Sequence, residues 1–93
     1  MEHKIMETNT EKAKRIIEAL RPLQENEKIR HIYVFHCPRC GHLRMYKNMA
    51  MNSLSRHANV FICNECGNDE AFRDMDNNPL PLTEWSLTKT FLK

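Results

Sequence analysis

The sequence predicts one small α+β domain that needs a cross-link to supplement its hydrophobic core. The chain has 93 residues, so it buries a modest fraction of its surface and its core alone is marginal. Only 8% of the residues are aromatic, which limits the core further. Four cysteines are present, and small domains of this kind are commonly held together by disulfides or by a structural metal.

The N-terminal part, residues 1–27, is predicted to be a helical extension. Thr8 or Thr10 can cap a helix, and Glu11 in the first turn suits the positive end of the helix dipole. Because the residue before a proline is disfavoured in the helical region, the helix should end just before Pro22. Its apolar stripe consists of residues at helical spacing, namely Ala13, Ile16, Ile17 and Leu20.

The central part, residues 28–78, is predicted to contain the cysteines on short strands. Residues 29–35 and 59–62 are rich in β-branched and aromatic residues, and each run leads into a cysteine pair. A second strand is expected over residues 43–46. A short helix capped by Asn52 or Ser53 is expected over residues 54–57.

Two further helical segments are predicted toward the C-terminus. Asn68 can cap a turn of helix with Asp69 and Glu70 in its first turn. Residues 79–93 are predicted to be an extended proline-containing segment followed by a short helix. Thr83 would cap that helix, which spans 84–90 and turns Trp85 and either Leu87 or Phe91 inward.

The four cysteines form two copies of the pattern Cys-x-x-Cys-Gly, and these copies also contain both glycines of the chain. Two residues between cysteines allow one tight turn to direct both sulfurs at one point, and Zn²⁺ prefers four thiolates in a tetrahedron. The glycine after each pair permits a left-handed turn. We therefore predict one Zn²⁺ ion held by Cys37, Cys40, Cys63 and Cys66.

Two other interpretations of the cysteines remain open but are weaker. A redox Cys-x-x-Cys pair would need a βαβ unit, for which the chain is short. Two disulfides would need an oxidising compartment, whereas the polar start of the chain and the lack of a long apolar run predict a cytoplasmic protein without a membrane span. Four thiolates leave no open position on a zinc ion, so we expect no enzymatic activity.

The cysteine segments resemble zinc-ribbon segments in phage and mobile-element proteins of Gram-positive bacteria. The resemblance rests on CPRCG at 37–41, NSLSRHANVFICNECG at 52–67, DEAFRD at 69–74 and PLPLTEW at 79–85. It implies a zinc ribbon, in which two knuckles on β-hairpins hold one metal ion. It also implies an accessory or regulatory role in a phage or mobile element.

Charge is distributed unevenly along the chain. Residues 28–62 carry six basic and no acidic side chains, whereas residues 63–93 carry three basic and six acidic ones. Such a separation can prepare a surface for an anionic partner. The candidate contacts to nucleic acid or to another partner are Arg39, His42, Arg44, Lys47 and Arg56. Arg39 and Arg44 could instead offset the negative charge of the metal centre.

Two functions follow from these observations. The first is binding of nucleic acid or a nucleoprotein complex through the basic face of the metal-bound domain. The second is a small inhibitor of the anti-defence or anti-CRISPR kind, which would bind a host defence or transcription protein by protein–protein contact. The N-terminal helix could also mediate a homodimer.

Overall fold

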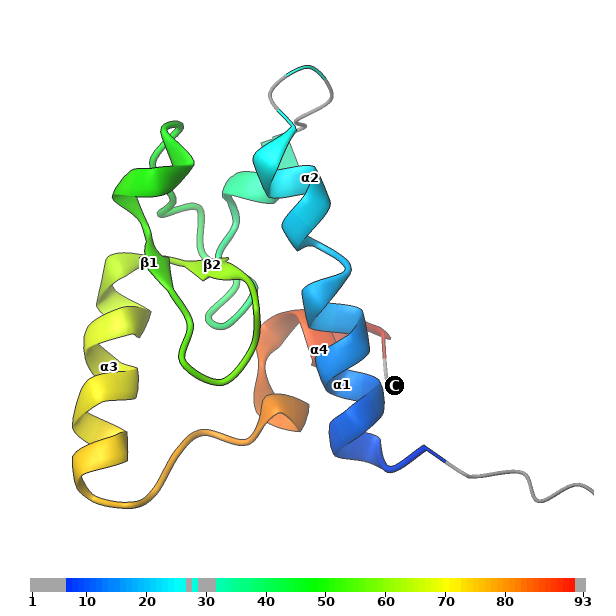
Figure 1. Cartoon of the computed structure of the whole chain (residues 1–93), viewed down its shortest axis with the longest axis vertical. Coiled ribbons are helices and arrows are strands. Elements are labelled where there is room, and N and C mark those ends of the chain that lie inside the picture. Colours follow the sequence, from blue (N-terminus) through cyan, green and yellow to red (C-terminus); the bar gives the residue numbers. More distant parts are fainter. Residues whose placement is uncertain (1–6, 27, 29–31, 92–93) are drawn as a thin grey trace, which may run out of the picture.

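The structure, a computed structural model, describes residues 7–26, 28 and 32–91, and places short helices around a small β-hairpin (Figure 1). Helices α1 and α3 lie on opposite sides, with the hairpin and α4 between them. The helices are α1 (Asn9–Glu18), α2 (Arg21–Glu25), α3 (Asn64–Met75) and α4 (Ser86–Phe91). The strands are β1 (Ser53–Leu54) and β2 (Phe61–Ile62), and the 3₁₀ turns are η1 (Ile32–Phe35), η2 (Met49–Met51) and η3 (Leu82–Glu84).

The predicted N-terminal helix is confirmed as α1. Thr8 is its N-cap, and Thr8 and Glu11 form a reciprocal capping box with two hydrogen bonds of 3.1 Å. Ala13 and Ile17 on its apolar stripe are completely buried. Helix α1 ends at Glu18, before Pro22 as predicted, but a second helix, α2, begins at Arg21. Pro22 lies in the first turn of α2, where a missing N–H costs nothing.

The central hairpin differs from the prediction. Strands β1 and β2 pair antiparallel, with Ser53 opposite Ile62 and Leu54 opposite Phe61. The strand predicted over 59–62 is confirmed in its second half, but the helix predicted over 54–57 is wrong. Asn52 caps no helix there; its side chain exchanges two hydrogen bonds of 2.8 and 3.1 Å with the backbone of Tyr46 and thereby anchors the preceding loop.

The strands predicted on either side of the first cysteine pair are wrong where the structure describes them. Residues 29–31 lie outside the described residues, and residues 32–35 form the 3₁₀ turn η1. Of the second strand, 43–46, only Leu43 pairs, in an isolated bridge with His36. Strand propensity reflects how well a residue fits a pleated, half-buried surface. Val34 has no strand neighbour among the described residues and is buried in the core instead, so its preference for strands has no effect here.

The C-terminal helices begin at other residues than predicted. Helix α3 begins at Asn64, so Asp69 and Glu70 lie in its middle and not in a first turn. Thr83 lies within η3, and α4 begins only at Ser86. Trp85 points into the core with 1% of its surface exposed, as predicted. Of the other two inward candidates, Leu87 packs against the core, while Phe91 is exposed.

Helices α1 and α2 are attached to the rest of the domain by apolar and polar contacts. Helix α1 packs against η3 and α4. The buried side chain of Gln24 pairs with the backbone of Phe61 through two hydrogen bonds of 2.9 Å, as a neighbouring strand would. Arg21 stacks over the ring of Phe61 at 4.6 Å. In the described part of the chain, each helix is too short or too polar to cross a membrane.

Candidate metal centre

The four cysteine sulfurs converge on one point. All lie within 4.8 Å of one another, and three of the four residues are buried. The sulfurs of Cys40 and Cys63, from different pairs, are 3.9 Å apart. Four sulfurs about 2.3 Å from a central ion lie about 3.8 Å apart in a regular tetrahedron. The cysteines therefore form a cluster that could hold one metal ion, and none of them forms a disulfide.

The first pair lies on a tight knuckle between His36 and Leu43. Gly41 N–H donates to the carbonyl of Cys37 at 2.7 Å, and Cys37 N–H donates to the carbonyl of His42 at 2.9 Å. Gly41 has a φ of 83°, which a residue with a Cβ adopts only at a cost. The predicted left-handed glycine and the predicted knuckle are both present here.

The second pair does not lie on a β-hairpin as predicted. Cys63 directly follows β2 and is the N-cap of α3, and Cys66 lies in the first turn of that helix. The Cys66 N–H donates to the Cys63 sulfur at 3.4 Å, and the Cys63 N–H donates to the Cys37 sulfur at 3.4 Å. The positive end of a helix lowers the free energy of a thiolate, so this position suits a metal ligand.

Two of the four thiols, those of Cys63 and Cys66, resist ionisation in the absence of a cation. Burial raises the pKa of the Cys63 thiol to about 11. A hydrogen bond with Cys37, together with burial, raises the pKa of the Cys66 thiol as well. A divalent ion reverses this preference, because a coordinated thiol is deprotonated. Metal binding here would therefore release protons.

Arg39 belongs to the metal centre and not to the outer surface. It is 7% exposed, and its Nη2 donates to an oxygen of Asp69 at 2.7 Å. Its guanidinium also lies beside Cys66, while its buried Nε has no hydrogen-bond acceptor among the described residues. A thiolate at Cys66 would offer negative charge to this guanidinium. The expectation that Arg39 contacts an external partner is not met, because the side chain is enclosed.

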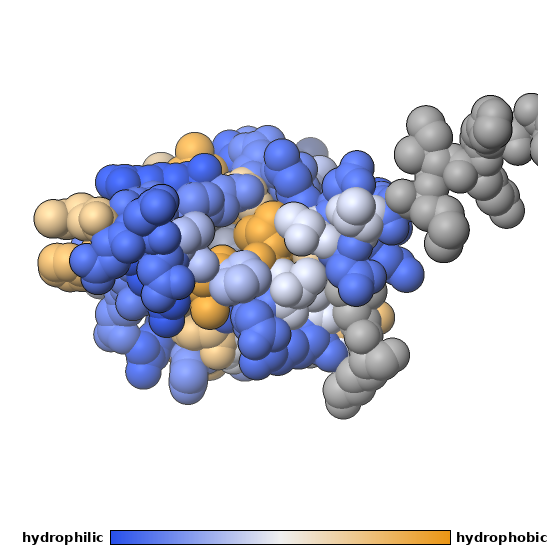
Figure 2. Space-filling view, turned by 90° about the horizontal axis from the view of Figure 1, so that it is seen from below, coloured by the Kyte–Doolittle hydropathy of each residue, from blue (hydrophilic) through white to orange (hydrophobic). Residues whose placement is uncertain are grey.

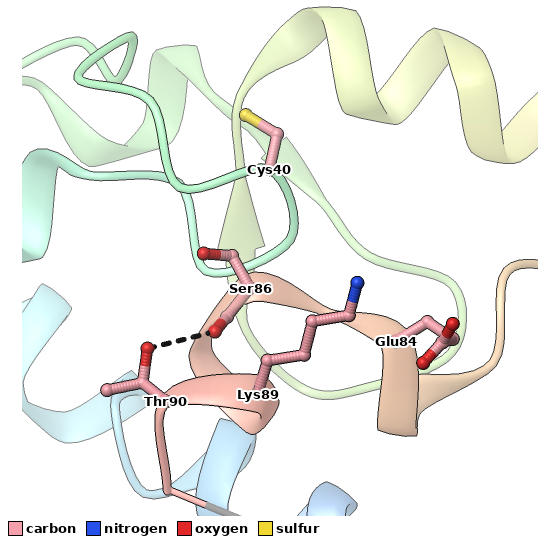
Figure 3. Close-up of a pocket in the computed structure, with 5 residues that line it drawn as sticks. All are labelled: Cys40, Glu84, Ser86, Lys89 and Thr90. Atoms are coloured by element: carbon pink, nitrogen blue, oxygen red, sulfur yellow. Dashed lines mark hydrogen bonds between the residues drawn. The ribbon is translucent and has the colours of Figure 1, made fainter. Parts of the chain in front are cut away.

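The C-terminal helix is attached directly to the first knuckle. The N–H groups of Ser86 and Leu87 donate to the carbonyls of Arg39 and Pro38, at 3.1 and 3.0 Å. Figure 3 shows an adjacent pocket of about 340 Å³, between Cys40 and α4. The sulfur of Cys40 points away from the other residues that line the pocket. The pocket thus borders the metal centre without presenting its sulfur to a ligand.

Two of the other four candidate contact residues face acidic side chains of α3. Arg44 pairs with Glu65, and Arg56 lies 3.7 Å from Asp74. Together with the Arg39–Asp69 pair, these contacts join residues of the basic window to acids that follow it in sequence. The remaining two candidates, His42 and Lys47, are exposed.

Sequence reasoning missed the role of the α3 acids in these pairs. Glu65 and Asp69 are four residues apart and hence lie on the same face of the helix. That spacing is the available signal, but it becomes visible only once the helix is known to begin at Asn64.

A serine and a histidine near the hairpin also acquire acidic partners. His57 Nε2 lies 2.8 Å from an oxygen of Asp74. Ser55 donates its hydroxyl to the buried Glu70 at 2.5 Å and accepts the N–H of His57 at 3.1 Å. The Ser55 hydroxyl is therefore directed at Glu70 and not at His57, and these contacts hold the loop against α3.

The chain matches no protein-family model, no curated protein and no solved structure.

Proposed function

We propose that this chain is a zinc-stabilised binding module without enzymatic activity, which recognises a protein partner. Its four thiolates would hold one Zn²⁺ ion, which supplies structural stability and, with four protein ligands, has no open position for a substrate. The supporting geometry is the convergence of four sulfurs within 4.8 Å and the enclosed guanidinium of Arg39 beside Cys66.

One observation carries the choice of a protein partner, namely the exposed apolar surface. In the described part of the chain, seven large apolar side chains have more than half of their surface exposed. Figure 2 shows apolar atoms in the middle of one face and at its edge, bordered by hydrophilic atoms. Exposed apolar patches with a polar border are typical of protein–protein contact sites. The seven residues are Leu43, Tyr46, Met51, Leu54, Phe72, Met75 and Phe91.

The ion pairs of α3 argue against nucleic acid as the partner. Three of the five residues of the predicted basic face, namely Arg39, Arg44 and Arg56, have an acidic neighbour on α3. A phosphate backbone approaching these arginines would also approach Glu65, Asp69 and Asp74. Phosphate neutralisation supplies most of the affinity of non-specific nucleic-acid binding, so this surface is poorly suited to it.

The metal part of the proposal is tested by elemental analysis of the purified full chain. We expect one zinc per chain, and loss of that zinc in the variant Cys66→Ser. Met75→Ser, which changes a side chain that is 81% exposed, is the matched control and should retain the metal. A wild-type chain without stoichiometric zinc, or a Cys66→Ser variant that keeps it, would refute a four-cysteine site.

The partner part is tested by mobility shift of the zinc-loaded chain with random-sequence duplex DNA and single-stranded RNA at 150 mM salt. We expect no shift. A shift that disappears in an Arg44→Glu, Lys47→Glu double variant would favour nucleic-acid binding instead. Arg39 is left unchanged in this test, because its replacement would disturb the metal centre.

A further inference from the structure

Helices α1 and α4 pack against each other (Figure 1). An open apolar groove runs between them. Its volume is about 820 Å³. Its apolar lining comes from α1, from the segment through α2 and from α4, namely Ile16, Ala19, Leu20, Leu23, Leu87 and Phe91. Phe91 is 65% exposed, so this wall lacks a covering partner within the described residues.

The charged residues that line the groove are all basic. They are Lys12 and Arg15, on the same side of α1 as Ile16 and Ala19, and no aspartate or glutamate of the described chain lines the groove. From Lys12 to Ala19 this side extends for about two helical turns. The groove therefore combines an apolar floor with a cationic end.

Arg15 already shows which ligand chemistry this end accepts. Its Nε and Nη2 donate to the two carboxylate oxygens of Glu7, at 3.0 and 2.9 Å. Glu7 and Arg15 are 38% and 62% exposed, and an ion pair this exposed contributes little to stability. A carboxylate from another molecule can hence replace Glu7 at little cost, while Lys12 adds a second positive charge.

We propose that this groove binds an amphipathic helix of a protein partner, whose apolar side chains fill the groove and whose acidic side chains meet Lys12 and Arg15. The inference rests on the proposed protein-binding function and specifies its surface. Helices recognised in this way present apolar residues at positions i, i+3, i+4 and i+7. The two helical walls and the basic end suit an apolar helix with acid at one end.

The test is selection from a displayed library of 18-residue helical peptides, randomised at all outward positions, against the zinc-loaded full chain. We expect enriched peptides to carry an apolar stripe and acidic residues at one end. Phe91→Ser and Lys12→Glu should each weaken their binding about tenfold, measured by fluorescence anisotropy.

The chain supplies a matched control for the charge variant. Lys14 is exposed on α1 without lining the groove. Lys14→Glu should leave peptide affinity unchanged. Circular dichroism and zinc content of all three variants should equal those of the wild type.

The possible outcomes distinguish a failure of the groove proposal from a failure of the proposed protein-binding function. Enriched peptides that are basic, or that bind Phe91→Ser and Lys12→Glu as tightly as the wild type, would overturn the groove while leaving protein binding in place. No enrichment, together with a nucleic-acid shift, would overturn both. A dimer in sedimentation that is lost in Phe91→Ser would show that a second copy of the chain occupies the groove, which also overturns the proposal.

Discussion

The two Cys-x-x-Cys-Gly copies share a local hydrogen bond but lie in different structures. In each copy the glycine N–H donates to the carbonyl of the first cysteine, at 2.7 Å for Gly41 and 2.9 Å for Gly67. The first copy then turns back toward Leu43, whereas the second continues as α3. The motif thus determines the local turn that brings its two sulfurs together. The residues that flank the motif determine whether this turn continues as a loop or as a helix.

The two glycines are also required for different reasons. Gly41 has a left-handed backbone, but Gly67 is helical. At Gly67 the constraint is space, because an added Cβ would lie 2.6 Å from the Cβ of Ser53 on β1. One glycine therefore permits a turn, and the other permits close packing of a helix on a strand.

Metal removal should have the largest effect on stability, since both cysteine pairs are expected to bind the same ion. Chelation of the zinc-loaded chain should unfold it, because a structural zinc site of this kind contributes about 10–16 kcal/mol of apparent binding free energy. Far-UV circular dichroism should show loss of helix, and amide NMR signals should collapse to narrow dispersion. A spectrum that survives complete chelation would mean that the core alone holds the fold.

Gly41→Ala should have the next largest effect. A Cβ in the left-handed region costs about 1–2 kcal/mol, and it would also lie 2.5 Å from the Ser86 hydroxyl oxygen on α4. We expect denaturant unfolding at fixed free zinc to show a loss of about 2–3 kcal/mol in total. Adding Ser86→Ala should recover only the unfolding free energy lost through the close contact with the Ser86 hydroxyl, because the backbone strain at position 41 remains. Full recovery of the wild-type unfolding free energy would show that this strain is absent.

Gly67→Ala should destabilise the domain less and in a manner that can be rescued. Overpacking against Ser53 costs about 1–3 kcal/mol, while alanine in a helix gains about 1 kcal/mol over glycine. The double variant with Ser53→Gly removes the clashing Cβ and should restore most of the unfolding free energy. If the double variant stays as unstable as Gly67→Ala, the constraint at Gly67 is not the contact with β1.

The sequence was sufficient for the features that local chemistry determines. The N-cap at Thr8, one of two candidates, the burial of Trp85 and the convergence of the cysteines all follow from residue type and spacing. The N-cap depends on contacts within one helical turn, and the convergence of the cysteines depends on the demands of one ion. The burial of Trp85 is a tertiary contact, but its large side chain already predicts it.

The sequence was insufficient where tertiary contacts override local preference. Residues 32–35 have strand-forming side chains but turn as η1, since no neighbouring strand accompanies them in the described part of the chain. Cys63 caps α3, a role that sequence rules assign to serine, threonine or aspartate. The early start of α3 in turn placed Asp69 opposite Arg39, and so converted a predicted surface contact into a buried one.

The smallest expected effect on stability distinguishes an arginine within the first knuckle, Arg39, from one that follows it, Arg44. Arg39 is enclosed beside Cys66 and Asp69, whereas Arg44 pairs with Glu65 at a surface where both side chains are well exposed. We expect Arg39→Met to cost about 1–2 kcal/mol, because a charged hydrogen bond is lost from an enclosed side chain. Arg44→Met should change stability by less than about 0.5 kcal/mol, as for most exposed pairs.

Zinc release on acidification gives these two arginines a second, independent readout. Protons compete with the ion for the thiolates, so zinc is lost as pH falls. The positive charge of Arg39 favours the thiolate of Cys66 over the thiol, and its removal should therefore move the release midpoint to higher pH. Arg44→Met should leave the midpoint in place, as monitored with a chromogenic zinc chelator. Equal midpoints for both variants would show that Arg39 serves only the ion pair with Asp69, and that the charge of the metal centre is balanced without it.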